Sequence, residues 1–169
     1  MTNQESLKQF NLDINNWSAK VGVESRLLFI GIATRLFENV VRRTPVGDPD
    51  YWQGHPKGSP SGNSKPPTGY LGGTAKNSWF CSINDKVEGG QRSADKQGAA
   101  ALDEINLRLV GAKLGDTAYL QNPLPYIQSL EDGTGSPRQA PEGMVQVSMA
   151  EIVSFYSNLN NVPVPGGAR

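Results

Sequence analysis

Hydrophobic residues near the start of the chain recur at the three- and four-residue spacing of an amphipathic helix. The first group follows a suitable N-cap residue, Asp13, and consists of Ile14, Trp17 and Val21. Gly22 comes directly after this group and is expected to end or kink the helix. The pattern therefore predicts an N-terminal arm with a short helix over residues 1–22.

A stronger helical pattern begins at Glu24. Its apolar stripe consists of Leu27, Ile30, Thr34, Phe37 and Val41. Further apolar residues widen this stripe to more than half of the helix circumference, so one sheet face is not enough to bury it and we expect a subunit partner. Arg42 and Arg43 suit the carbonyl end of a helix, which we expect to stop before Thr44-Pro45.

Four later segments have the alternation or the apolar density of β-strands. They contain Trp79, Cys81 and Ile83; Ile105, Leu107 and Leu109; Ala118 and Leu120; and Met144–Val147. The segment between the first two, from Glu88 to Gly98, is rich in Gly, Ser, Gln and charged residues, and it is predicted to be a mobile hairpin tip or arm. We expect the strands to form an antiparallel sheet with one face buried.

A final helix is predicted near the C-terminus. Ser148 and Glu151 have the spacing of a capping box, which would open a helix carrying Ile152 and Phe155. Residues 160–169 are predicted to be an extended tail. The fold class is therefore α+β in a single domain, with an antiparallel sheet of about four strands packed against one long helix of the N-terminal half.

Residues 47–72 differ from every other part of the chain, because Gly, Pro, Ser and Asn dominate them. They are predicted to form a long inserted loop, and loops of this length are commonly functional. Tyr51, Trp52 and Tyr70 either anchor the loop on another chain or pack beneath it, and both interpretations stay open. With His55 they form the candidate interface.

Charge and composition narrow the class of protein. Lys and Arg number 16, as do Asp and Glu, and the absence of a basic stripe argues against a nucleic-acid footprint. Residues 1–43 carry six Lys or Arg and four Asp or Glu, whereas residues 116–169 carry two and five. This asymmetry fits either an ordinary solvated surface or a ring in which opposite ends of neighbouring subunits meet.

The sequence also predicts whether the chain has a membrane segment, a secretory leader or a disulfide. No apolar run approaches the length of a membrane span, and the N-terminus lacks a signal pattern, so we expect neither a membrane segment nor a secretory leader. Cys81 is the only cysteine, which excludes an intrachain disulfide and a Cys-rich zinc site. We expect synthesis in a reducing compartment.

Residue types that could support catalysis are present without a motif that joins them. His55 is the only histidine, and no pattern places Ser or Cys beside it. Asp48, Asp50 and His55 supply too few ligands for a divalent cation, and the Gly-rich segments lack a phosphate-binding pattern. The adjacent carboxylates Glu131 and Asp132 would point to opposite faces of a strand. We therefore expect no enzyme activity, no cofactor and no metal.

Three segments, taken together in order and spacing, resemble a known family. The first is Thr44-Pro45-Val46, the second covers residues 73–79, and the third covers residues 122–133 followed by 139–145. They are similar to segments of the small neck or tail-completion proteins of long-tailed bacteriophages, and the likeness spans most of residues 24–158. The residues that the resemblance implies as scaffold are Thr44, Pro45, Gly73, Trp79, Tyr126, Leu130, Gly133, Pro141 and Gly143.

The chain departs from this family at three places. Residues 47–72 are inserted where family members run almost directly into the next motif, so we interpret this loop as a lineage-specific attachment element. Thr74 stands where an arginine is usual, and Asp132 replaces a frequent aromatic residue. The corner around Asp132 is therefore not expected to pack as it does in relatives.

The resemblance implies a structural virion protein that assembles in the host cytoplasm as a ring, with a hexamer expected, at the neck between capsid connector and tail. The implied partners are further copies of the chain, the head-completion or connector protein, and the tail terminator or tail tube protein. DNA would pass through without sequence-specific binding. Because residues 116–169 have few Lys and Arg, we hypothesise that Glu131, Asp132 and Glu142 line the lumen.

Two alternative functions stay open on the sequence. A tail-terminator ring protein, which caps the tail tube, would have the same small helix-and-sheet character. A cytosolic protein-binding module would use the aromatic loop instead, with Tyr51 and Trp52 as its contacts.

Overall fold

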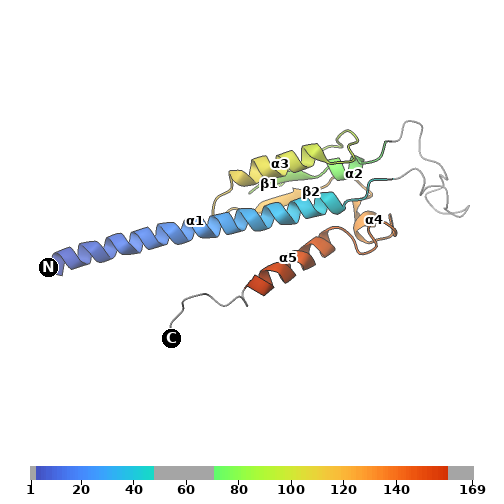
Figure 1. Cartoon of the computed structure of the whole chain (residues 1–169). Coiled ribbons are helices and arrows are strands. Elements are labelled where there is room, and N and C mark those ends of the chain that lie inside the picture. Colours follow the sequence, from blue (N-terminus) through green and yellow to red (C-terminus); the bar gives the residue numbers. More distant parts are fainter. Residues whose placement is uncertain (1–2, 48–70, 160–169) are drawn as a thin grey trace, which may run out of the picture.

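The computed structural model describes residues 3–47 and 71–159 of the chain (Figure 1). Within these ranges the elements, in chain order, are α1 (Asn3–Arg43), α2 (Thr74–Asn77), β1 (Phe80–Ile83), α3 (Ala99–Val110), β2 (Ala118–Gln121), α4 (Ile127–Glu131) and α5 (Val145–Leu159). The fold class is α+β, as predicted, with a long N-terminal helix and a small antiparallel sheet.

The C-terminal half of α1 is the centre of the packed body. Helix α3 lies along one side of it and α5 along the other, and both contact α1 (Figure 1). Strands β1 and β2 pair antiparallel, with Phe80 opposite Gln121 and Ile83 opposite Ala118. The sheet and α3 also pack on each other, so the body is built from helices around a two-stranded ribbon.

The prediction of about four strands is wrong, since the described residues form two. Ile105 and Leu109 lie on α3, where both are completely buried. Leu107, which the alternating pattern placed on the same face, is 72% exposed. The spacing that matters is therefore four residues, through Ala101, Ile105 and Leu109, and it begins in a run of alanines that favours a helix.

The predicted last strand, Met144–Val147, is the start of helix α5 instead. Met144, Ser148 and Ile152 are buried at four-residue spacing, as one face of a helix requires. The predicted capping box is wrong as well, because Ser148 lies inside the helix, where its hydroxyl donates to the carbonyl of Met144 at 2.7 Å. The actual cap is supplied by a carboxylate from α4, described below.

The segment between β1 and α3 is not a hairpin tip, because a helix follows it. It lies across the outer face of the sheet, where the Val87 amide donates to the Gln121 side chain at 2.9 Å. Arg92 fixes its far end: the guanidinium lies 4.0 Å above the Phe80 ring and pairs with Glu104 of α3. It also donates to the carbonyl of Trp79 at 3.2 Å, so this segment is tied to both the sheet and α3.

Helix α1 is continuous from Asn3 to Arg43, so the prediction that Gly22 ends or kinks a short helix is wrong. A glycine inside a helix costs about 1 kcal/mol relative to alanine, which weakens a helix without terminating it. Termination comes only at Thr44-Pro45, as predicted, where Lys76 also donates to the carbonyl of Arg42 at 2.9 Å.

The corner between α1 and the sheet is held by one buried hydrogen-bond chain. The Thr44 hydroxyl donates to the carbonyl of Val40 at 2.8 Å and accepts from the indole N–H of Trp79 at 2.8 Å. Thr44 and Trp79 are both buried, next to the completely buried Val41 and Cys81. The end of α1 is therefore joined to the entry of β1.

We expect Thr44→Val to lower the free energy of unfolding by about 1–3 kcal/mol, because it keeps the side-chain volume and leaves the buried Trp79 N–H without an acceptor. Urea denaturation of purified protein measures this change. In a double-mutant cycle with Trp79→Phe, the two losses should not add. Thr117→Val, at an exposed position, is the control, and an equal loss there would contradict the assignment.

The buried thiol of Cys81 gives a second test of the core. Burial raises its pKa to about 11, with Glu104 adding to the rise and Arg108 opposing it. Because the thiolate is the reactive form, iodoacetamide should alkylate the native protein at pH 8 far more slowly than the urea-unfolded chain.

The raised pKa of Cys81 also fixes the sign of a pH effect on stability. Folding favours the protonated thiol, so its contribution is fully present below pH 9 and is lost as the pH rises from 9.0 toward 11. We expect Cys81→Ala to flatten the fall in unfolding free energy across this window. Parallel profiles for the two proteins would show that the thiol does not contribute.

Candidate interaction surfaces

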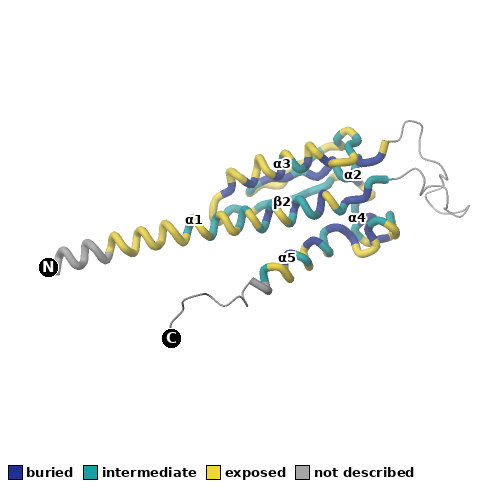
Figure 2. The backbone as a smooth tube through the Cα atoms, viewed as in Figure 1, coloured by how far each residue is buried: buried dark blue, intermediate teal, exposed yellow. Residues whose placement is uncertain are grey.

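The N-terminal half of α1 stands clear of the body. Figure 1 shows it projecting past the ends of α3 and the sheet, and in Figure 2 its part from residue 11 to residue 21 is coloured as exposed. Every residue from 11 to 21 is exposed. The body begins at Arg26, whose guanidinium donates to the carbonyls of Ala112 at 2.7 Å and Val110 at 2.8 Å and so caps the C-terminal end of α3.

This projecting part shows apolar side chains to solvent. Trp17 is 65% exposed, and Ile14, Val21 and Leu28 are exposed beside it. Their positions differ by three, four and seven residues, so they lie on one face of the helix. We call these four residues the α1 stripe. The amphipathic pattern that the sequence shows at Ile14, Trp17 and Val21 is thus real, but nothing among the described residues covers it.

The α1 stripe continues the face of α1 on which α5 is seated. Glu151 of α5 binds Arg43 at 2.8 Å and Asn39 at 3.2 Å, and Arg35 lies 4.2 Å above the Phe155 ring. Residues 35, 39 and 43 are four apart, and counting back in steps of three and four from Arg35 leads to Leu28 and Val21. Helix α5 therefore covers the C-terminal part of this face and leaves the rest open.

Two further groups of exposed apolar residues lie on opposite sides of the body. Met149 and Val153 are four residues apart on α5, and Val153 is 63% exposed. On the α3 side, Leu107, Val110 and Leu114 are exposed. Because α1 lies between α3 and α5 (Figure 1), these groups belong to helices on opposite sides of α1. We call them the α5 pair and the α3 patch.

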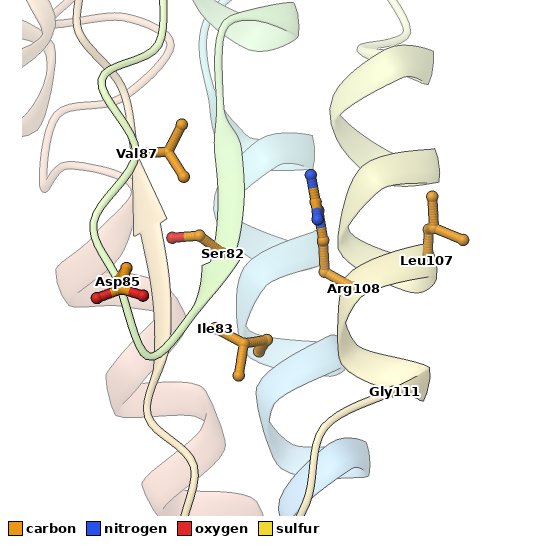
Figure 3. Close-up of a pocket in the computed structure, with 7 residues that line it drawn as sticks. All are labelled: Ser82, Ile83, Asp85, Val87, Leu107, Arg108 and Gly111. Atoms are coloured by element: carbon orange, nitrogen blue, oxygen red, sulfur yellow. The ribbon is translucent and has the colours of Figure 1, made fainter.

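A groove of about 400 Å³ lies at the edge of the α3 patch, between β1, α3 and the segment after β1 (Figure 3). Arg108 stands between β1 and α3, and Leu107 lies at the rim. The hydroxyl of Ser82 is buried there without a hydrogen-bond partner among the described residues. The groove is lined by Ser82, Ile83, Asp85, Val87, Leu107, Arg108 and Gly111.

All three scaffold glycines are required by close backbone contacts at positive φ. Gly73 has φ +88°, and a Cβ there would meet the backbone of Asp95 at 2.4 Å. Gly133 and Gly143 have φ +73° and +76°, and a Cβ on them would meet the carbonyls of Pro141 and Glu131 at 2.3 Å. Any other residue would force these segments apart. Gly143, however, precedes a helix and not the predicted strand.

The remaining scaffold residues of the third segment differ in burial. Leu130 of α4 is buried in the core, whereas Pro141 and Tyr126, which lies next to α4, are exposed. Leu130 therefore anchors α4, and the reversal at Gly133 brings Pro141 against it.

The three hypothetical lumen residues have different environments. Glu131 accepts hydrogen bonds from the backbone amides of Met144 at 2.8 Å, Val145 at 2.9 Å and Gln146 at 3.0 Å. It therefore caps the N-terminus of α5, where amides without a helical partner and the helix dipole favour a carboxylate. Asp132 and Glu142 are exposed, and Asp132 accepts from the Gln128 side chain at 2.8 Å. Glu131 thus has a structural role whatever surrounds the chain.

We expect Glu131→Ala to lower the free energy of unfolding by about 0.5–2 kcal/mol, because three amides at the start of α5 lose their acceptor. Urea denaturation gives the total, and hydrogen exchange should show faster exchange at residues 144–146. Glu142→Ala removes a nearby exposed carboxylate and should change neither quantity. Equal effects of the two substitutions would rule out the cap.

Arg26 and Arg92 were not identified from the sequence as residues that organise the body, and Glu151 was predicted only as part of a capping box. Arg26, Arg92 and Glu151 join elements that are far apart along the chain: Arg26 reaches residues 110 and 112, and Glu151 reaches residues 39 and 43. A local spacing pattern cannot detect such pairs. Asp95 is different, since it accepts from the amides of Gln97 and Ala99, which hold its pKa below the usual range. Its place just before an alanine run is a local helix-start signal.

The candidate interface residues Tyr51, Trp52, His55 and Tyr70 lie outside the described residues. Among the residues that are described, no three His, Cys, Asp or Glu side chains gather as a metal site would require. The described helices also include none long and apolar enough to span a membrane.

Comparison with known proteins adds no relative, since no protein-family model, no curated protein and no solved structure matches the chain.

Proposed function

We propose that this chain is a structural virion protein of a long-tailed bacteriophage, a neck or tail-completion subunit that forms a ring between the capsid connector and the tail. The observation that carries the proposal is the pair of apolar surfaces on opposite sides of the body, the α3 patch and the α5 pair. Together with the resemblance of three ordered segments, they favour a subunit that is completed by its neighbours.

A ring of identical subunits needs two different surfaces that fit each other. A head-to-tail contact joins one patch to another, and it closes when the rotation between subunits fits a whole number of copies. The α5 pair projects from a helix, whereas the α3 patch borders a groove of about 400 Å³. Insertion of Met149 or Val153 of one subunit beside Leu107 of the next is the contact that we propose.

The packing of the resembling segments supports the same proposal. Thr44 and Trp79 share a buried hydrogen bond, and Gly73 and Gly143 each hold backbones in contact. The residues on which the resemblance rests are therefore those that fix the corners of this fold. A likeness carried by structural residues is an associational argument for function, so the test is made on the particle.

The proposal extends to the setting of the ring. We propose a hexamer, located in the virion neck after assembly in the host cytoplasm, with the connector or head-completion protein on one side and the tail terminator or tail tube on the other. DNA passes through without sequence-specific contacts. The chain has no catalytic role in this proposal.

Two substitutions test the ring contact in the phage that encodes the chain. Leu107→Asp and Val153→Asp each place a charge in one of the two proposed surfaces, and both sites are exposed, so urea denaturation should show unchanged folding. We expect electron microscopy of the lysates to show separate heads and tails. Ser154→Asp, at an exposed site next to Val153 on α5, is the matched control and should give joined particles.

Three outcomes contradict the proposal. Absence of the chain from purified virions would favour a cytosolic binding module. Its location at the tail side of complete, separated tails would favour a tail terminator. Joined particles from both charged variants would show that the contact lies elsewhere.

A further inference from the structure

We propose that the α1 stripe binds the same stripe of a second copy, so that the projecting halves of two α1 helices pair side by side in opposite directions. This pairing concerns the free protein, and it does not depend on the proposed virion function. The surface is the exposed face made by Ile14, Trp17, Val21 and Leu28, and the occupant is another molecule of this chain.

The first argument is the spacing along the helix. Ile14, Val21 and Leu28 are separated by seven residues each, and Trp17 follows Ile14 by three. In the sequence, Leu7 and Phe10 continue the same spacing toward the N-terminus. This is the arrangement of the first and fourth positions of a heptad, whose 3.5-residue period keeps one seam facing a partner helix.

The second argument is continuity with a contact that the chain already makes. The same face of α1 seats α5 at residues 35, 39 and 43, and α5 runs in the opposite direction to α1 (Figure 1). A second α1 lying antiparallel on the α1 stripe would follow α5 along the same face and in the same direction. The packing geometry that α1 uses within the chain is therefore available for a partner.

The third argument is length. In an antiparallel pair of helices, the numbers of two residues that lie opposite each other always have the same sum. If Ile14 of one helix lies opposite Trp17 of the other, Asn3 therefore lies opposite Leu28. The overlap then ends where the body begins, since Arg26 is already bonded to the end of α3. The projecting part of one α1 is thus covered along its whole length by that of the other.

Side-chain size favours the antiparallel direction. A parallel pair would place Trp17 against Trp17 in one layer and Ile14 against Ile14 in the next, so that layers of very different volume alternate. The antiparallel pair puts one large and one smaller side chain, Trp17 with Ile14, in each central layer. Such uniform layers suit the close packing of protein interiors.

Charge favours the same direction. Asp13 and Lys20 occupy equivalent heptad positions beside the seam, one before Ile14 and one before Val21. In the antiparallel register, Asp13 of each helix lies next to Lys20 of the other, and two such pairs form across the two-fold axis. In a parallel pair, the residues across the seam from them are Ser18 and Ser25, which carry no charge. Rim charges of this kind select the orientation of helices more than they add affinity.

The two-fold pair has a consequence for ring formation. A contact that reverses direction cannot be repeated around a ring with two different faces. If the chain forms such a ring through its α3 patch and α5 pair, the α1 pair belongs to the free subunit and has to open, or link separate subunits, before a ring closes.

Sedimentation equilibrium of the purified full chain tests the pairing. We expect a monomer–dimer equilibrium, and we expect Trp17→Ala to raise its dissociation constant more than about tenfold, as loss of a central aromatic contact commonly does. Leu12→Ala, at an exposed site on the side of α1 away from the α1 stripe, is the control and should leave the constant unchanged. A monomer at all accessible concentrations, or a dimer indifferent to Trp17→Ala, would overturn the proposal.

Charge reversal tests the direction. Asp13→Lys alone and Lys20→Asp alone should each weaken the dimer, because each creates two like-charge contacts. An equimolar mixture of these two variants should dimerise again, since each contact between position 13 of one helix and position 20 of the other then joins opposite charges. Asp103→Lys makes the same change of net charge on α3. This variant should dimerise by itself like the unchanged chain, and mixing it with Lys20→Asp should not bring the Lys20→Asp chain into the dimer. Equal behaviour of the two mixtures would overturn the antiparallel arrangement.

Discussion

The packing of α3 and α5 on opposite sides of the C-terminal half of α1 is the interaction on which the rest of the structure depends. The two-stranded sheet is too small to form a stable unit without a helix against it. Its inner residues, such as Cys81, are buried because α1 and α3 cover them. The hydrogen bond between Thr44 and Trp79 then fixes where the sheet begins relative to the end of α1. Removing α1 would leave α3 and α5 without the helix on which both pack.

The two halves of α1 differ in burial and therefore in what stabilises them. Its C-terminal half is stabilised by burial, with Val40 and Val41 almost without solvent contact. Its N-terminal half is exposed, and it lacks the tertiary packing from which most helices in proteins gain their stability. Apolar side chains on such a helix are therefore more easily explained by a partner that covers them than by the fold of one chain. The α3 patch and the α5 pair lead to the same view of the molecule as a component of an assembly.

Much of the fold could be predicted from the sequence where local signals agree with tertiary packing. The C-terminal half of α1, its end at Thr44-Pro45, and both strands were found because periodicity and turn residues point the same way. The errors came from short apolar runs that fit two periods. Ile105 and Leu109 satisfy alternation as well as a four-residue spacing, and only the exposure of Leu107 decides between them. For Met144–Val147, the deciding fact is the Glu131 cap, which comes from a segment more than ten residues earlier.

The candidate surfaces were less accessible to sequence reasoning. The pattern at Ile14, Trp17 and Val21 indicated an amphipathic helix, but a periodic stripe has the same appearance whether its own fold or another molecule covers it. The two cases can be distinguished only when the position of the body along α1 is known, and the body begins at Arg26. The α5 pair was missed for a similar reason. Val153 belongs to an apolar helix, and the sequence does not show which side of that helix packs on α1.

The bond between Arg26 and the end of α3 gives the projecting helix a mechanical property. At 1.5 Å per residue, the part of α1 before Arg26 is a rod about 35 Å long, held at one end. Arg26 acts as its fulcrum, because any tilt of the rod pulls on the last carbonyls of α3, which in turn packs on β1. A tilt of about 5° at that point moves the tip of a 35 Å rod by about 3 Å. Small strains inside the body are therefore amplified into large displacements at the tip, and a load applied at the tip is delivered directly to the core.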